Sequence, residues 1–151
     1  MKRIASFSVD HDKIGKGMYI SRIDGDITSF DLRTRVPNAG DYMDNVTMHS
    51  VEHMLATFLR NGEIGGNVIY FGPMGCRTGF YLLTRDLAPE AVKAALITAL
   101  ERTLAHEGQV FGASRRECGN YLDLDLEDAK KECAAYLAVL KAHKGDFHYA
   151  E

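Results

Sequence analysis

The chain has 151 residues, the usual size of one domain, and we expect a single domain over residues 1 to 151. Hydrophobic residues make up 46% of the chain and charged residues 26%, proportions that exclude an intrinsically disordered protein. The formal net charge is −3 and no basic block stands out, so nucleic acid is not an expected partner.

The sequence predicts neither a membrane segment nor export. The apolar run Ala134 to Leu140 has seven residues, whereas a helix needs about 20 to cross a bilayer. The residues that follow Lys2 and Arg3 are too polar for the apolar part of a signal peptide. Three cysteines are too few, and odd in number, for a disulfide framework, so we expect a reducing, cytoplasmic compartment.

The first third of the chain is predicted to form strands. Apolar and polar residues alternate from 5 to 10 and again from 29 to 33. Asp24-Gly25-Asp26 separates two extended segments, residues 18 to 23 and 27 to 32, and predicts a tight hairpin. Two further short apolar runs, 67 to 71 and 79 to 84, are also typical of strands.

Three helices are predicted around and after these strands. The first covers roughly residues 47 to 61, the second runs from Pro89 to Gly108, and the third is capped by Asp125 and ends at Gly145. Cys133 lies on the apolar stripe of the third helix and is expected in the core. Strands early and helices late predict an α+β fold, a mainly antiparallel sheet with the helices packed on one face.

The first predicted helix carries the pattern His49-Ser50-Val51-Glu52-His53. Histidines at positions i and i+4 lie on one face, so both can bind one metal ion. Glu52 projects about 100° away from His53 and can act as an acid or base beside the ion. The pattern is equally compatible with a solvated helix edge, and it also occurs in inverzincin metallopeptidases.

Two cysteines in loops are candidates for chemistry. Cys118, followed by Gly119 and Asn120, is the candidate third metal ligand, although free cysteine is more often a small buried hydrophobe. Cys76 follows a Gly-Pro-Met-Gly turn and precedes Arg77, a context in which backbone N–H groups and a cation favour the thiolate. A loop cysteine without a role is the alternative for Cys76.

Arg33 lies on the polar side of its predicted strand together with Asp31. An arginine there can bind a substrate carboxylate bidentately. A surface ion pair with Asp31 is the other interpretation, and the sequence favours it slightly.

Several motifs together resemble the S-ribosylhomocysteine lyase (LuxS) family, in residue type and in order. The resemblance covers roughly residues 5 to 140, nearly the whole chain. The motifs are Ser6-Phe7 with Asp10-His11, Phe30-Asp31-Leu32-Arg33 with Pro37-Asn38, the His49 to His53 pattern, the run from Pro73 to Tyr81, and Cys118-Gly119-Asn120-Tyr121.

The resemblance implies a homodimer with active sites at the subunit interface and one divalent metal per subunit. The metal would be Fe²⁺, with Zn²⁺ or Co²⁺ able to replace it, bound by His49, His53 and Cys118. The family cleaves S-ribosylhomocysteine to homocysteine and 4,5-dihydroxy-2,3-pentanedione, the precursor of the autoinducer-2 signal, a step of the activated methyl cycle.

By the same resemblance, Cys76 and Glu52 move protons during carbonyl migration and β-elimination. Ser6, His11 and Arg33 match positions that bind substrate, and Arg33 of one subunit would serve the metal of the other.

The chain also departs from the family pattern. It has Tyr70-Phe71-Gly72 where members have Asp-Ile-Ser, and Leu124 where many have histidine. These positions bear on recognition of the homocysteine end of the substrate. An inverzincin-like metallopeptidase is the alternative function, but such an enzyme has no need of the Cys76 thiol and usually takes a carboxylate as its third ligand.

Overall fold

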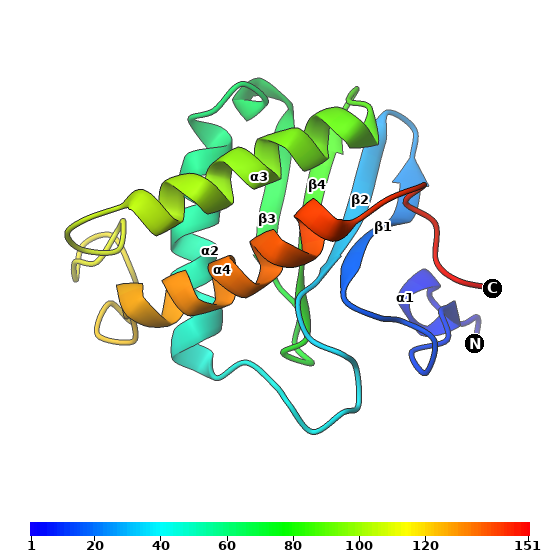
Figure 1. The fold of residues 1–151 in the computed structure, drawn as a ribbon, viewed down its shortest axis with the longest axis horizontal. Coiled ribbons are helices and arrows are strands. Elements are labelled where there is room, and N and C mark those ends of the chain that lie inside the picture. The colour runs from blue at the N-terminus through cyan, green and yellow to red at the C-terminus, as the bar shows by residue number, and fades with distance from the viewer.

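The computed structural model describes every residue from Met1 to Glu151. Figure 1 shows the arrangement of its helices and strands. In chain order these are α1 (Ala5–Ser8), β1 (Gly17–Asp24), β2 (Ile27–Arg33), α2 (Asn45–Arg60), a short 3₁₀ helix (Gly65–Asn67), β3 (Val68–Pro73), β4 (Gly79–Arg85), α3 (Pro89–Ala105) and α4 (Leu126–Ala142).

The four strands form one antiparallel sheet in the order β1-β2-β4-β3. The hairpin between β1 and β2 turns at Gly25, whose φ of +62° lies in the left-handed region that glycine adopts without strain. Asp24, at the end of β1, pairs with Ile27, at the start of β2, across this turn. The predicted antiparallel sheet and the predicted hairpin are therefore confirmed.

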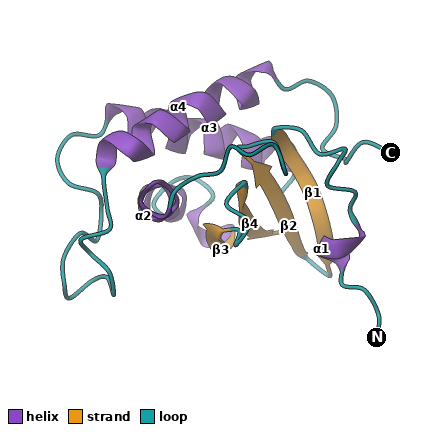
Figure 2. Cartoon of the chain, turned by 90° about the horizontal axis from the view of Figure 1, so that it is seen from below, coloured by secondary structure: helices purple, strands orange, loops and turns teal.

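Helices α2, α3 and α4 pack on one another and cover one face of the sheet (Figure 2). Helix α2 lies beside the β3 edge, and the Tyr136 hydroxyl of α4 donates a hydrogen bond of 2.8 Å to the Gly17 carbonyl oxygen at the start of β1. The core lies between the two layers, and Phe30, Leu82 and Leu96 are among its fully buried side chains. No helix in the structure combines the length and the hydrophobicity that spanning a bilayer requires.

The three predicted long helices are confirmed, with ends within a few residues of the expected ones. Asp125 caps α4 as predicted, because its side chain accepts a hydrogen bond from the Asp128 backbone N–H. Cys133 is only 1% exposed, which confirms that it belongs to the core. Its pKa is raised to about 12, first by burial and then by the charge of Glu132.

The predicted strand over residues 5 to 10 is wrong, because residues Ala5 to Ser8 form the single turn α1. No side chain of α1 is buried, and Phe7 is 70% exposed, so the alternation there does not mark a buried face. The free edge of β1 is contacted instead by the segment after α4, where the Ile20 N–H donates to the Phe147 carbonyl oxygen at 2.7 Å.

Candidate active site

Helix α2 places His49 and His53 one turn apart on the same face. The helix is capped by Asp44, whose carboxylate accepts a hydrogen bond of 2.7 Å from the Thr47 backbone N–H. This bond, with a smaller contribution from charge, lowers the pKa of Asp44. Other faces of α2 carry the buried residues that pack in the core, such as Val51, so the two imidazoles are left facing the loop between α3 and α4.

Backbone carbonyl groups of that loop orient both imidazoles. His49 Nδ1 lies 2.9 Å from the Asp123 carbonyl oxygen, and His53 Nδ1 lies 2.7 Å from that of Phe111. An Nδ1–H that donates to a carbonyl leaves Nε2 free as a metal ligand. The approach to His53 is close, since a Cβ on Gly112, whose φ is +71°, would lie 3.1 Å from Nδ1.

Cys118 completes a cluster of three ligands. Its Sγ lies 3.3 Å from His49 Nε2, and one ligand atom from each of His49, His53 and Cys118 lies within 4.8 Å of the others. Ligand atoms that share a tetrahedral ion lie roughly 3.4 to 3.8 Å apart, by the usual bond lengths of about 2.0 to 2.3 Å. Cys118 Sγ and His49 Nε2 lie at about this spacing, and two nitrogens with one sulfur form a donor set that fits a mononuclear divalent metal.

Glu52 is half-buried on α2, between the two histidines in sequence. Its side chain points about 100° away from that of His53, as helix geometry requires. None of the ion pairs in the chain involves it. A carboxylate that is not engaged by a cation remains available to exchange protons with a ligand.

Cys76 lies in the turn between β3 and β4. The turn is closed by a hydrogen bond of 2.9 Å from the Met74 N–H to the Gly79 carbonyl oxygen, and Arg77 adopts a φ of +64° within it. Cys76 is exposed, and its Sγ lies 3.0 Å from Thr78 Oγ1. The turn therefore presents the thiol to solvent while a hydroxyl holds it in place.

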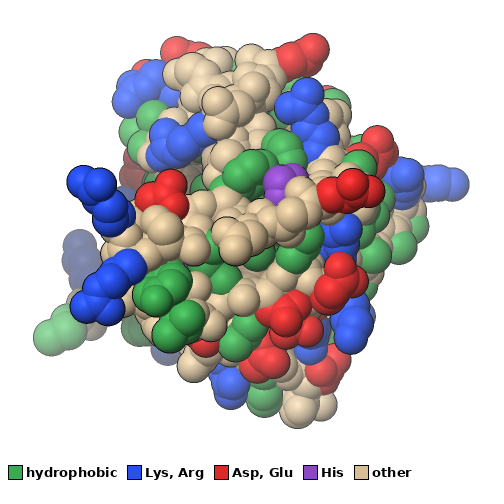
Figure 3. Space-filling view, turned by 90° about the vertical axis from the view of Figure 1, so that its left-hand side faces the viewer, with side chains coloured by type: hydrophobic (Ala, Val, Ile, Leu, Met, Phe, Trp, Pro, Cys, Tyr) green, Lys and Arg blue, Asp and Glu red, His purple; other side chains and the backbone are tan.

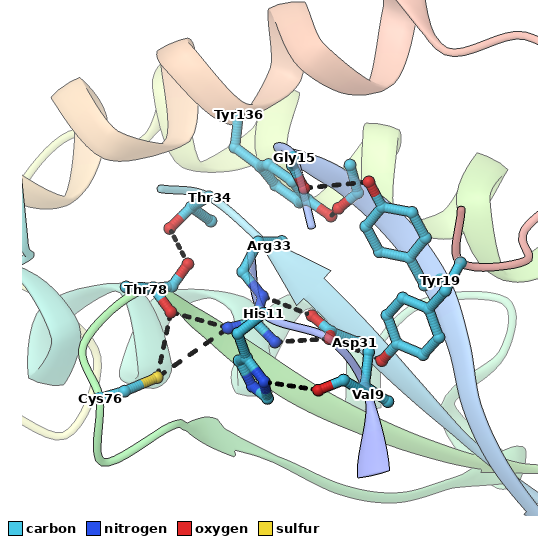
Figure 4. Close-up of polar contacts among 12 residues, drawn as sticks. Val9, His11, Gly15, Tyr19, Asp31, Arg33, Thr34, Cys76, Thr78 and Tyr136 are labelled. Atoms are coloured by element: carbon cyan, nitrogen blue, oxygen red, sulfur yellow. Dashed lines mark hydrogen bonds and ion pairs between the residues drawn. The ribbon is translucent and has the colours of Figure 1, made fainter. Parts of the chain in front are cut away.

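Arg33 lies beside this thiol and is paired with Asp31 (Figure 4). Arg33 Nε and Nη2 donate to the two oxygens of Asp31 at 3.0 and 2.6 Å. Nη1 donates to Thr78 Oγ1 at 2.8 Å and lies 4.0 Å from Cys76 Sγ. Two of the three guanidinium nitrogens are thus occupied by Asp31, and Nη1 is the one that faces the thiol.

The predicted pair between Arg33 and Asp31 exists, but it is not at the surface. Both residues lie on the sheet face opposite the helices, yet their side chains are only 3% and 2% exposed. Burial lowers the pKa of Arg33, but the hydrogen bonds and the charge of Asp31 outweigh it and raise that pKa overall. Arg33 therefore stays charged next to Cys76.

Ser6 and His11 come from the N-terminal segment. Ser6, in α1, lines a shallow groove of about 470 Å³ over the uncovered face of the sheet, together with Tyr70 and Tyr81. His11 Nδ1 lies 2.9 Å from the Val9 carbonyl oxygen. In Figure 4 the His11 ring and the Arg33 guanidinium extend into the same region.

The predicted site residues thus fall into two groups within one chain. The three metal-ligand candidates lie on the loop side of α2, and no hydrogen bond joins them to the group around Cys76 and Arg33. The molecular face beyond the α3–α4 loop is shown in Figure 3, where histidine reaches the surface over only a small area. One chain does not by itself join the two groups into one continuous network.

Sequence reasoning missed two residues of the Cys76 group. Thr78 contacts both Cys76 and Arg33, and it lies in the run from Pro73 to Tyr81, in which the sequence singles out only Cys76 and its neighbour Arg77. Tyr149, near the end of the chain, donates a hydrogen bond of 2.7 Å to Asp31 Oδ2. No local sequence pattern predicts this contact.

The departures from the family pattern also have a structural context. Tyr70 is 52% exposed, and its ring lies over Gly72, where a Cβ would clash with the tyrosine hydroxyl. Leu124 packs partly buried against the core. Tyr70 and Gly72 therefore form one local arrangement, in which the missing side chain at one position makes room for the ring of the other.

Comparison with known proteins gives one consistent result. A family model described as S-Ribosylhomocysteinase (LuxS) matches residues 4–146. A Clostridium beijerinckii protein named S-ribosylhomocysteine lyase is 44% identical over 142 residues, which is 86% of each chain. Proteins of the same name from Borrelia garinii subsp. bavariensis and Clostridium acetobutylicum are 41% and 45% identical over 146 residues, covering 93% of this chain and 93% and 92% of theirs.

Proposed function

This chain belongs to the S-ribosylhomocysteinase (LuxS) family, and from that premise we propose that it cleaves the thioether of S-ribosylhomocysteine. The products are homocysteine and 4,5-dihydroxy-2,3-pentanedione, the precursor of autoinducer-2. The observation that carries the proposal is the Cys76 thiol beside Arg33, in a chain that also holds a cluster of two histidines and a cysteine. A metallopeptidase would have no use for that second thiol.

The donor set of His49, His53 and Cys118 supports binding of one divalent metal per subunit. When bound, the ion supplies a Lewis acid that polarises oxygen atoms of the substrate. We infer Fe²⁺ as the working metal. Zn²⁺ and Co²⁺ also suit a site of imidazole and thiolate, so occupancy depends on supply as well as affinity.

The remaining chemistry is proton transfer, which the side chains of the chain itself perform. Moving the carbonyl along the ribose requires a C–H proton to leave one carbon and a proton to return to its neighbour. We assign these transfers to the Cys76 thiolate and the Glu52 carboxylate. Arg33 stabilises the thiolate by its charge, and Thr78 orients the sulfur.

The final step is a β-elimination. Once the carbonyl is at C3, a base removes the proton from C4, the electron pair forms the C4–C5 double bond, and the C5–S bond breaks. The sulfur leaves with the bonding pair and takes up a proton as homocysteine. The resulting enol then isomerises to the dione, so the reaction needs neither an oxidant nor an organic cofactor. Ser6 and His11, on the open side of the sheet, are the candidates to bind the substrate.

We infer a homodimer in which two subunits complete each active site. The face of the sheet that the helices leave uncovered is available to a second copy, and exposed apolar side chains such as Ile4, Phe7 and Tyr70 lie near it. Association through this face would bring the Cys76 and Arg33 group of one subunit to the metal ligands of the other.

Mixed dimers test that arrangement. A dimer of a Cys76→Ala subunit and a Cys118→Ala subunit holds one intact composite site, so activity should return to about half that of the wild type per dimer. Arg33 lies 4.0 Å from Cys76 in the same chain, so a Cys76→Ala and Arg33→Gln dimer serves as the control and should stay inactive. No recovery in a verified Cys76→Ala and Cys118→Ala heterodimer would contradict a shared site.

We also propose that residues 1 to 151 form a single domain that works in the cytoplasm. One sheet and one cluster of 24 buried residues support the single domain. The three cysteines are all unpaired, which suits a reducing compartment.

The experiment that tests the reaction class supplies anaerobically purified, metal-loaded protein with either S-ribosylhomocysteine or a peptide library. We expect homocysteine and the dione, identified by mass spectrometry, and no cleaved peptide. Peptide cleavage without homocysteine release would favour the metallopeptidase instead.

A further inference from the structure

The segment after α4 returns to the edge of the sheet and reaches the group around Cys76. Phe147 is 5% exposed, and its carbonyl oxygen accepts the hydrogen bond from Ile20 in the edge strand β1. Two residues later, the ring of Tyr149 stacks on that of Tyr19, with centroids 4.9 Å apart and planes 18° apart. The backbone bond and the ring stack hold Tyr149 in a fixed position.

The Tyr149 hydroxyl donates a hydrogen bond of 2.7 Å to Asp31 Oδ2. The same oxygen accepts from Arg33 Nη2 at 2.6 Å, so the carboxylate is held between the tyrosine and the guanidinium. Burial first, and then the charge of Asp31, raise the pKa of Tyr149, so the phenol stays protonated and continues to donate at neutral pH.

We propose that Tyr149 is a positioning residue of the active site: its hydroxyl holds the Asp31 carboxylate, which in turn fixes the Arg33 guanidinium beside the Cys76 sulfur. The chain of contacts runs from the hydroxyl to Asp31 Oδ2, from both Asp31 oxygens to Arg33, and from Arg33 Nη1 toward Thr78 and Cys76. Tyr149 lies beyond residues 4–146, which the family model matches, so the family match assigns it no role.

The electrostatic consequence has a definite direction. A donor on Asp31 disperses part of the negative charge of the carboxylate, which leaves more of the Arg33 charge for the nearby sulfur. Without the Tyr149 hydroxyl, only Arg33 compensates the negative charge of Asp31. The carboxylate then repels a second anion more strongly, which disfavours the thiolate form of Cys76. The other titratable groups near Asp31 are the phenols of Tyr19, Tyr81 and Tyr136, which are neutral donors and do not replace that hydrogen bond.

This inference rests on the proposed function, because it concerns the thiol to which that function gives a proton-transfer role. Its test therefore reads out the thiol directly and does not depend on turnover. Tyr149→Phe keeps the ring stack on Tyr19 and removes only the hydroxyl. Tyr19→Phe is the matched control, since the Tyr19 hydroxyl donates to the Gly15 carbonyl oxygen rather than to Asp31.

The measurement is the rate of iodoacetamide alkylation of Cys76 from pH 5 to 9, followed by mass spectrometry of the peptide that carries it. We expect Tyr149→Phe to move the alkylation profile toward higher pH and to slow alkylation at pH 7 by about two- to fivefold. This is less than the full effect of losing a hydrogen bond to a charged group, because the hydroxyl acts on Cys76 only indirectly, through Asp31 and Arg33. Metal content and KM should stay at wild-type values while kcat falls. Tyr19→Phe should behave as the wild type.

An unchanged or faster alkylation of Cys76 in Tyr149→Phe would overturn the inference, as would an equal slowing in Tyr19→Phe. Failure of the proposed function looks different, since wild-type protein would then release no homocysteine whatever the state of its thiol. Thermal unfolding of each variant confirms that the fold is retained before rates are compared.

Discussion

The pair of Asp31 and Arg33 allows a prediction that distinguishes a buried ion pair from a surface one. The two differ several-fold in the unfolding free energy that is lost when one partner is removed. Asp31→Asn keeps the shape of the side chain and removes its charge. Arg33 then remains in a site where its side chain is 3% exposed, without the carboxylate that accepts two of its hydrogen bonds. An uncompensated buried charge of this kind is strongly destabilising.

The expected loss is about 3 to 5 kcal/mol of unfolding free energy, the range for breaking a buried ion pair by removing one partner. For a chain of this size, at about 2 to 4 °C per kcal/mol, the melting temperature should fall by roughly 6 to 20 °C. A surface pair would give a loss of only about 0 to 1 kcal/mol. The double variant Asp31→Asn/Arg33→Met should recover part of the loss, because it leaves no unpaired charge.

Denaturant unfolding at one fixed protein concentration measures these losses. The control is Asp24→Asn, which breaks the Arg22–Asp24 pair, whose side chains are 56% and 49% exposed, and should cost less than about 1 kcal/mol. An Asp31→Asn variant as stable as Asp24→Asn, or a double variant less stable than Asp31→Asn, would refute the reasoning.

Three further predictions concern the metal ligands and the helix that carries two of them. Cys118→Ala should lose stoichiometric metal by elemental analysis, whereas Cys133→Ala should keep it and lose about 1 to 2 kcal/mol of stability, because that thiol only packs in the core. Gly112→Ala should weaken metal binding in a competitive chelator titration, since its Cβ would lie 3.1 Å from His53 Nδ1, and wild-type affinity would count against this contact. Asp44→Ala should cost about 1 kcal/mol at pH 7, from the lost cap. Because the pKa of Asp44 is lowered in the folded protein, the difference in unfolding free energy between wild type and Asp44→Ala should be largest above the ordinary aspartate pKa. It should disappear as the pH falls through the lowered pKa of the folded protein. A difference independent of pH would exclude the charge-assisted cap.

Local patterns were sufficient for most of the fold and for part of the site. The helical spacing of His49 and His53 already predicts two ligands on one face, and α2 confirms that geometry. The turn residues around Gly25 likewise predict the hairpin that the structure contains. Cys118 is 69 residues from His49, so its place in the cluster came from its residue type and from the family resemblance rather than from spacing.

Long-range contacts explain the two features that sequence patterns did not predict, the burial of the Arg33–Asp31 pair and the absence of a strand over residues 5 to 10. Alternation places Arg33 on a polar strand face, which normally meets solvent, but Tyr149 reaches Asp31 there from 118 residues away and helps enclose the pair. The apolar alternation in residues 5 to 10 fails as a strand signal for a related reason. A strand needs a partner, and part of the available β1 edge is contacted by the segment that contains Phe147.

The most direct test of the account is homocysteine release from S-ribosylhomocysteine in D₂O by metal-loaded wild type, Cys76→Ala and Glu52→Gln. We predict that both variants keep the metal and lose release, and that deuterium enters recovered sugar at different positions in the two, because the residues act in different proton transfers. Normal release by Cys76→Ala would contradict the mechanism. Identical deuterium patterns in the two variants would contradict the division of roles between Cys76 and Glu52.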